Sequence, residues 1–427
     1  MKKYIYKISV AILALGAFFA CEDAPSRFDG YTGGKPVIRY IRPCDATVSD
    51  SLLSSAFLGN QIAVIGDQLA DVNAIYFNDQ KAKLNPEFVT NNSIIVTIPN
   101  GIPSIKQDII KFCTKTDTVI YTFETKVPSP AINSMDCEYI EEGKTAVIHG
   151  LYFVNDGGSP LEVYFSNNLK AEIVSSDLNN ITVKVPAGAQ PGPITVKSVY
   201  GTKVSSLWYK DNRNIIAAFN HGISPDYDFY HGWHGASGIS NVNGINGYYL
   251  KINGEAKELT DNTWDDGFLS WEKWSYLPTD PDFFDASKLS NYVCKFEAKV
   301  IGKWSSKALQ VIFTGASDVM LNWQNGNGLT FDPKFGGANG YVKYEEYPRA
   351  LWQPWATAAD KTFESNDWVT VTIPMTDFVY SPTGAKLAAP NGSGHYTGLT
   401  IFLYGGGVKG TPCNTTMYID NVRIVQK

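Results

Sequence analysis

The fold is decided by a pattern that reads GNQIAVIGDQLADVNAIYFN at residues 59–78 and returns as GKTAVIHGLYFVNDGGSPLEVYFSN at residues 143–167. A second pair of segments follows at a similar distance, TNNSIIVTIPNGI at 90–102 and LNNITVKVPAGA at 178–189. Such self-similarity at a fixed period marks repeated structural units. Each copy corresponds to a domain of about 85–90 residues.

Both copies have the alternation of β-strands. Ile94, Val96 and Ile98 alternate with other residues in the first copy, and residues 181–185 do so in the second. Side chains two positions apart lie on the same face of a strand, so these residues are expected to face a core. Glycine and proline turns separate the alternating runs. The pattern predicts a small β-sandwich for each copy.

The shared pattern I-x-G-x-x-(F/L)…V-Y-F…I-x-V-x-V-P resembles immunoglobulin-like IPT/TIG domains over roughly residues 36–211. We place the first such domain at 36–127 and the second at 128–211. In that family tandem copies commonly act as spacers. Neither copy contains a cluster of titratable residues, so a spacer role is expected here as well.

Beyond residue 211 the composition changes, because nine of the ten tryptophans follow it. Alternating apolar residues recur at 248–252, 309–313, 369–373 and 399–403, and the chain closes on MYIDNVRIV at 417–425. We expect a larger, jelly-roll-like β-sandwich over 212–427, with its first and last strands side by side. The whole chain is therefore predicted to be all-β.

Composition excludes one class of function. The formal net charge is −6, and no basic run longer than two residues occurs beyond the N-terminus. Nucleic-acid binding relies on clustered Lys and Arg, so no nucleic-acid partner is expected. Aromatic residues reach 13% and charged residues only 18%, which favours an extracellular β-rich protein.

The stretch from Leu321 to Trp355 combines aromatic rings with amide and guanidinium groups in a glycine-rich context. Rings stack on the apolar faces of sugars, while amides and Arg bind hydroxyl groups at the ring edges. We therefore predict that it binds an oligosaccharide. The predicted platform residues, in order of preference, are Trp352, Trp323, Trp355, Tyr344 and Tyr347, with Gln353 and Arg349 as polar partners.

A second aromatic cluster, TWDDGFLSWEKWSYLP, contains Trp271 and Trp274. Because these two are three positions apart, they fit one face of a short helical turn over the core equally well. The sequence leaves both interpretations open.

Motifs for catalysis and metal binding are weak. The paired carboxylates at 265–266 and 345–346 are sequence neighbours, which point to opposite faces of a strand, whereas glycoside hydrolysis needs two facing carboxylates. H-E-x-x-H, P-loop and G-x-S-x-G motifs are absent. DNTWDDG at 261–267 resembles a Ca²⁺ loop only in part, since Trp264 occupies a ligand position. We expect no enzyme and no cofactor, and the motif leaves a structural Ca²⁺ undecided.

The N-terminus reads as an export signal. Residues 1–20 pair a basic start with a short apolar run that ends before Cys21, and 21–35 form a polar, glycine-rich tether. A cysteine at this position resembles the lipidation site of bacterial lipoproteins, although plain secretion is the alternative. Acidic residues after it resemble the surface-export signal of Bacteroidetes lipoproteins. Cys44 with Cys113 and Cys294 with Cys413 are permitted disulfides, with unpaired thiols as the alternative.

The complete layout resembles the surface glycan-binding lipoproteins of Bacteroidetes polysaccharide utilisation loci, in the position of surface glycan-binding protein B or of SusE and SusF. That resemblance implies a lipid-anchored protein on the outer membrane, with a SusC/SusD-like transporter and surface hydrolases as partners. Stretches such as RALWQPW and DWVTVTIPMTDF are similar to members that bind hemicelluloses such as xyloglucan, mannan or mixed-linkage glucan, so the expected ligand is a hemicellulose or another β-glucan or β-mannan. A surface glycoside hydrolase or lyase with TIG spacers and a protein-binding adhesin are the alternatives.

Overall fold

The computed structural model describes residues 33–48, 50–220, 238–260, 271–273, 281–314, 322–324, 328–330, 349–388, 396 and 398–427. Strands dominate these residues, and the helical elements are short 3₁₀ turns: η1 (Ala46–Val48), η2 (Pro86–Phe88), η3 (Ser166–Asn168), η5 (Ala286–Asn291), η7 (Pro354–Ala356) and η8 (Met375–Asp377). Within the described ranges no helix is long and apolar enough to cross a membrane.

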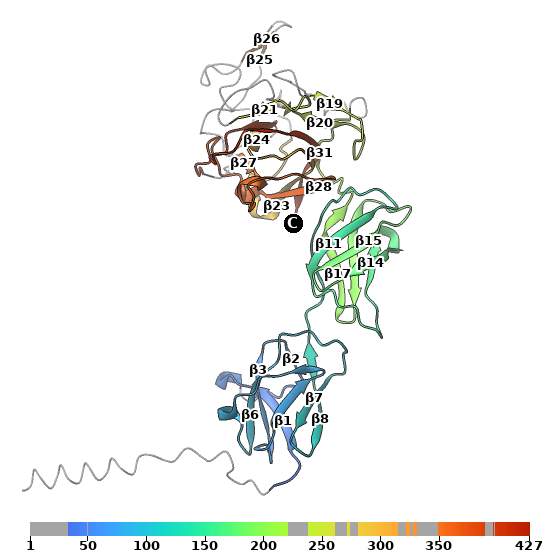
Figure 1. Ribbon diagram of the computed structural model, residues 1–427, viewed down its shortest axis with the longest axis vertical. Coiled ribbons are helices and arrows are strands. Elements are labelled where there is room, and N and C mark those ends of the chain that lie inside the picture. The colour runs from blue at the N-terminus through green and yellow to red at the C-terminus, as the bar shows by residue number, and fades with distance from the viewer. Residues whose placement is uncertain are drawn as a thin grey trace, which may run out of the picture. The chain divides into compact units, whose positions relative to one another are not determined.

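The first domain contains two main sheets (blue to blue-green in Figure 1). One has the order β1-β3-β6, formed by Val37–Pro43, Gln61–Asp67 and Ser93–Thr97. The other has the order β5-β4-β7-β8, formed by Gln80–Lys81, Ala74–Phe77, Ile109–Cys113 and Thr118–Thr122. A short parallel pair joins β2 (Ser55–Phe57) to β9 (Glu124–Lys126). Ile94, Val96 and Ile98 are buried between the sheets, as their alternation predicts.

The second domain repeats this plan. One sheet has the order β10-β11-β15-β14, formed by Ala131–Met135, Thr145–Leu151, Asn180–Lys184 and Glu172–Ser176. The other has the order β13-β12-β16-β17, formed by Leu169–Lys170, Glu162–Phe165, Gly192–Ser198 and Gly201–Tyr209. Ile181, Val183 and Val185 are at most 1% exposed. Two immunoglobulin-like β-sandwiches are thus confirmed.

One glycine in each copy explains part of the repeated pattern. Gly66 and Gly150 lie at equivalent places, each opposite a register shift in the neighbouring strand. A Cβ atom at Gly66 would lie 2.1 Å from the Val37 carbonyl oxygen, and one at Gly150 would lie 1.9 Å from that of Ala131. Because backbone occupies this space, only glycine fits the bulged pairing.

The third domain is a larger sandwich of two sheets. The first sheet has the order β19-β20-β31-β23-β28, with β18 also paired to β31. Its strands are Gly238–Ser240, Tyr249–Ile252, Thr416–Gln426, Tyr292–Ile301, Val369–Pro374 and, for β18, Ile215–Ala217. The pairing of β18 with β31 brings the domain's first and last strands together, as predicted.

The second sheet of this domain has the order β22-β29-β24-β27, formed by Trp271–Lys273, Gly398–Tyr404, Ala308–Thr314 and Arg349–Trp352. Two short pairs accompany it, β21 (Glu258–Leu259) with β30 (Cys413–Asn414) and β25 (Asn322–Gln324) with β26 (Gly328–Thr330). Leu309, Val311, Leu399 and Ile401 project into the core between the two sheets. The jelly-roll-like sandwich is confirmed.

Residues 130–153, 162–197 and 202–427 belong to one compact unit, so the second domain packs directly on the third. Glu138 of the second domain is 2% exposed and forms ion pairs with two cations of the first sheet of the third domain. Its carboxylate contacts Lys295 Nζ, and its Oε2 atom lies 2.7 Å from Arg423 Nη2. Arg423 Nη1 also lies 2.8 Å from Glu297 Oε2.

Hydrogen bonds of the backbone and of Thr370 add to the contacts between the second and third domains. The Glu138 N–H donates to Thr370 Oγ1 at 2.7 Å, and the Thr370 hydroxyl donates to Glu297 at 2.9 Å. The guanidinium of Arg423 lies 5.3 Å from the centre of the Tyr139 ring. A buried carboxylate with this many partners holds the two domains in one arrangement, because losing any partner strands a charge away from water.

The five described cysteines, at 44, 113, 137, 294 and 413, are free thiols. Neither permitted disulfide forms. Burial raises the pKa of the Cys294 thiol to about 12, so this thiol is an unreactive part of the core.

Candidate functional site

The outer face of the sheet β22-β29-β24-β27 carries the residues of the candidate site. Direct pairing sets Gln310 opposite Phe402 and Ile312 opposite Thr400, on the face that does not contact the core. Alternation adds Tyr404 to the same face. The outer face therefore combines amide, hydroxyl and aromatic groups and carries no carboxylate among these positions.

Gln310 organises the middle of this face. Its Nε2 donates to the carbonyl oxygens of Tyr404, at 2.8 Å, and Pro382, at 3.0 Å. Its Oε1 accepts a hydrogen bond from Arg349 Nη1 at 3.0 Å. Both side chains are fully buried, so they need these partners. Gln310 thereby connects β24, β27, β29 and the turn at 380–385.

That turn and a run of three glycines enclose a hollow of about 260 Å³ at the β27 edge. Its walls include Leu351, Gln353, Tyr380, Thr383 and Val408. Gly405, Gly406 and Gly407 all have positive φ, and a Cβ at Gly407 would lie 2.2 Å from the Thr383 carbonyl oxygen. Glycine is required here because the two loops approach backbone to backbone.

Gln353 lies at the rim of this hollow. Its Nε2 donates to the Gly406 carbonyl oxygen at 3.2 Å, while its buried Oε1 has no hydrogen-bond partner among the described residues. A buried amide oxygen without a partner is costly, and a hydroxyl donor is the natural complement. Of the predicted polar partners, Gln353 is the one that lines the hollow, and its side chain is half-buried there.

Arg349, the other predicted polar partner, has 0% of its surface exposed. It lies on the outer face, opposite Ile312, but its guanidinium is covered and held by Gln310. In this structure the Arg349 guanidinium is bound to Gln310 within the face, and its N–H groups are not exposed to a ligand. Direct contact of Arg349 with a sugar stays a prediction.

Trp352 and Trp355 both lie on the core side of the sheet. Trp352 pairs with Leu309, an inward residue, and its ring lies 5.3 Å from that of Trp304 and 5.6 Å from that of Phe296. Trp355 is 1% exposed, and its Nε1 donates to the Lys307 carbonyl oxygen at 2.8 Å. Trp355 is thus enclosed in the core, whereas Trp352 keeps part of its surface exposed, and its role as a platform stays a prediction.

The remaining predicted residues are only partly described. The backbone of Trp323, in β25, pairs with that of Leu329, and the backbone of Trp271, in β22, pairs with that of Ile401. Tyr344, Tyr347, Trp274 and Cys21 lie outside the described residues, as does the partial Ca²⁺ loop at 261–267. Their roles stay predictions.

Sequence reasoning missed Gln310, Tyr380, Thr400, Phe402 and Tyr404. The available signal was strand phase: Gln310 interrupts the apolar run ALQVIFT, and Thr400 interrupts LTIFLY. A sheet buried on both faces reads as a continuous apolar run, so a polar residue within it marks a special position. The same two-residue alternation in β27 places Trp352 on the inner side of the sheet, together with Ala350.

Titratable groups with large shifts lie elsewhere. Burial raises the pKa of Glu297 and of Asp420, yet both lie on the first sheet of the third domain. In the described part of the chain, no group of three or more His, Cys, Asp or Glu residues forms a potential metal site. On the outer face of the second sheet, Gln310, Ile312, Thr400 and Phe402 are fully buried. The hollow at its edge, which no charged side chain lines, is chemically suited to holding a neutral, hydroxyl-rich molecule.

Comparison with known proteins agrees with this chemistry. Residues 209–426 match the family model of the surface glycan-binding protein B xyloglucan binding domain. The chain is similar to the crystal structure of a surface glycan-binding protein B from Prevotella bryantii, with 28% identity and a TM-score of 0.81. That match covers 92% of this chain and 99% of the other.

Two further matches are weaker. An IPT/TIG domain-containing protein of Bacteroides ovatus is 27% identical over 235 residues, which are 50% of this chain and 46% of that protein, so the chain spans about half the length of this relative. A surface glycan-binding protein B from Bacteroides uniformis has 16% identity and a TM-score of 0.45, over 92% of this chain and all of the other. The Prevotella bryantii protein is described as a glycan-binding protein, and the Bacteroides ovatus protein is described by its domains. The family match spans the third domain and more than half of the sequence, and the chain belongs to the surface glycan-binding protein B family.

Proposed function

We propose that the protein is a non-catalytic, cell-surface glycan-binding protein whose third domain captures a neutral hemicellulose chain. The observation that carries this proposal is the family match over residues 209–426, which coincides with the domain that presents the neutral outer face. The family's description supports xyloglucan as the first ligand to test, with mixed-linkage β-glucan and β-mannan next.

The chemistry of the face supports a neutral ligand. Tyr380, Thr383 and Gln353 line the hollow with hydroxyl and amide groups, and Leu351 adds an apolar wall. A sugar ring has apolar C–H faces and hydroxyl edges, so it pairs with both kinds of wall. One such contact is weak, and useful affinity requires several ring positions along the face.

The test is affinity gel electrophoresis of the full chain in gels that contain xyloglucan, galactomannan, mixed-linkage β-glucan or xylan. We expect retardation by at least one of them, most strongly by xyloglucan. Release of reducing ends from the same panel should stay at the level of a protein-free control. Retardation by none of these glycans, or steady release of reducing ends, would overturn the proposal.

We further propose that the protein is anchored in the outer membrane through a lipid on Cys21 and acts beside a SusC/SusD-like transporter and surface hydrolases. The sequence motif and the family's surface location support this placement. Substituting Cys21→Ala should move the protein from the membrane fraction to the soluble fraction. Unchanged membrane attachment would rule out the lipid anchor.

A further inference from the structure

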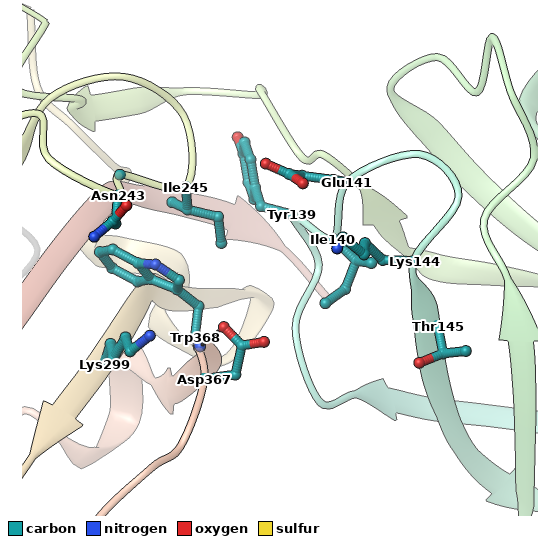
Figure 2. A pocket seen from close by; sticks show the side chains of 11 residues that line it. Tyr139, Ile140, Glu141, Lys144, Thr145, Asn243, Ile245, Lys299, Asp367 and Trp368 are labelled. Atoms are coloured by element: carbon teal, nitrogen blue, oxygen red, sulfur yellow. Dashed lines mark hydrogen bonds between the residues drawn. The ribbon is translucent and has the colours of Figure 1, made fainter.

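A second cavity lies between the second and third domains, on the side of the third domain away from the candidate face. It has a volume of about 410 Å³. Figure 2 shows its lining: residues of the second domain's 139–145 segment face Asn243, Ile245, Lys299, Asp367 and Trp368 of the third domain. The volume falls within the roughly 300–1,000 Å³ range of small-molecule sites, which often form at domain junctions.

The floor of this cavity is rigid. Trp368 and Tyr139 are 6% and 4% exposed and pack in one cluster with Tyr249 and Cys137. The Trp368 ring lies 5.6 Å from the ring of Tyr249 in an edge-on arrangement. Directly beside Tyr139, Glu138 joins the buried ion pairs of the junction. The cavity is therefore formed before any ligand arrives, which lowers the cost of binding.

The rim carries four charged side chains of balanced sign. Lys144 and Lys299 face the cavity with Glu141 and Asp367, and within the described part of the chain none of the four takes part in an ion pair. Asp367 Oδ1 accepts a hydrogen bond from the Trp368 N–H at 2.8 Å and keeps its other oxygen available. The exposed amide of Asn243 adds a further donor and acceptor.

We propose that this junction cavity, defined by Tyr139–Thr145, Asn243–Ile245, Lys299, Asp367 and Trp368, is a second glycan subsite that binds one to three neutral sugar units. Sugar hydroxyls donate to the carboxylates of Glu141 and Asp367 and accept from the ammonium groups of Lys144 and Lys299. Ile140, Ile245 and the indole edge contact the C–H faces. Because the charges cancel, an uncharged ligand fits better than an anion or a cation.

The ligand class in this inference rests on the proposed function. Its consequence is that one polysaccharide chain can bind the protein at two sites. Trp368 and Tyr139 expose little ring surface, so the cavity lacks an open stacking platform and binds more weakly than the main face. A polysaccharide that is long enough to reach both sides of the third domain gains from the second contact through effective concentration.

The test is peptide-resolved hydrogen exchange of the full chain with cellotetraose, mannotetraose or xylotetraose at saturating concentration. We expect at least a twofold slowing of exchange in the segments around 139–145 and 243–247 with at least one of these sugars. The double substitution Lys299→Met with Asp367→Asn should abolish this slowing, while Lys303→Met, an exposed lysine outside the cavity, should preserve it.

No slowing with any of the three sugars would overturn the proposal, as would slowing that survives the double substitution. Equal slowing by glycine, a small zwitterion, would overturn the assignment to sugars. Failure of the main proposed function is distinguishable, because it would abolish gel retardation by polysaccharides without changing the exchange of these two segments.

Discussion

The third domain has two outer faces that arise from the same strand alternation and serve opposite purposes. On the sheet of β23, β28 and β31 the outward residues are charged, and Lys295, Glu297 and Arg423 meet Glu138 of the second domain. On the sheet of β24, β27 and β29 the outward row around Gln310 is mainly neutral, polar or aromatic. The first face contacts another domain, while the second ends at a hollow lined by uncharged side chains.

This contrast shows what makes a binding face in a sandwich. Buried charges need close partners, and Glu138 supplies them from a neighbouring domain. Amides in a sheet are satisfied by local carbonyls, as Gln310 is, and need no partner from another domain. The second immunoglobulin-like domain is therefore more than a spacer, because it covers one face of the domain that carries the candidate site.

The largest expected effect comes from removing the buried ion pairs between the second domain and the first sheet of the third domain. Substituting Glu138→Ala leaves Lys295 without its carboxylate and Arg423 with one partner fewer, in a junction that excludes water. We expect a loss of about 3–5 kcal/mol in the free energy of unfolding. Chemical denaturation measures this loss, and glycan retardation at low temperature should be unchanged. A stable variant would show that the junction contributes little.

The next effect tests whether Trp352 serves to pack the core or to stack on a glycan. Trp352→Ala should lower the free energy of unfolding by about 2–3 kcal/mol, since the ring packs against Phe296, Trp304 and Phe363. The folded variant should still be retarded by glycan. Loss of retardation with an unchanged thermal melt would restore Trp352 as a binding platform.

Strand phase accounts for much of what the sequence could predict. The buried sets at Ile94–Ile98, Leu309–Phe313 and Leu399–Leu403 follow from period-2 alternation, and the repeat predicts two similar domains. Phase also predicts that Trp352 faces inward, yet its place in an aromatic-rich segment favoured the opposite interpretation. The junction was not predictable, because Glu138 meets Arg423 across 285 positions and no local pattern reports such a contact.

A smaller effect should follow from disturbing the neutral face. Gln310→Leu removes the acceptor for Arg349 and the donor for two carbonyls, so we expect a loss of about 1–3 kcal/mol in stability. The turn at 380–385 should loosen as a result, and glycan retardation should weaken. Gln310→Glu keeps the acceptor for Arg349 but removes the donor to the two carbonyls, so both quantities measured on the two variants separate the acceptor's contribution from the donor's. If the glycan retards both variants as strongly as the wild type, this hydrogen-bond network is not needed for glycan binding.

The smallest effect concerns Asp420, whose pKa burial raises well above its ordinary value. Its folded form binds a proton more tightly than its unfolded form does, so this residue lowers stability as pH rises from about 4 through the raised pKa. Asp420→Asn should therefore increase the free energy of unfolding by about 1 kcal/mol at neutral pH, with a smaller gain near pH 4. Denaturation at several pH values tests this, and an equal or opposite change at all of them would contradict it.

The most direct test of the central claim is affinity gel electrophoresis in xyloglucan. It compares wild type, the rim variant Tyr380→Ala with Gln353→Ala, and the control Lys303→Met, which changes an exposed lysine outside both cavities. Thermal melts of all three proteins should agree within a few degrees. We predict that Lys303→Met is retarded as strongly as wild type and that the rim variant loses most of its retardation. If the rim variant keeps its fold and is retarded as strongly as the wild type, the assignment of the glycan to the hollow beside β27 is contradicted.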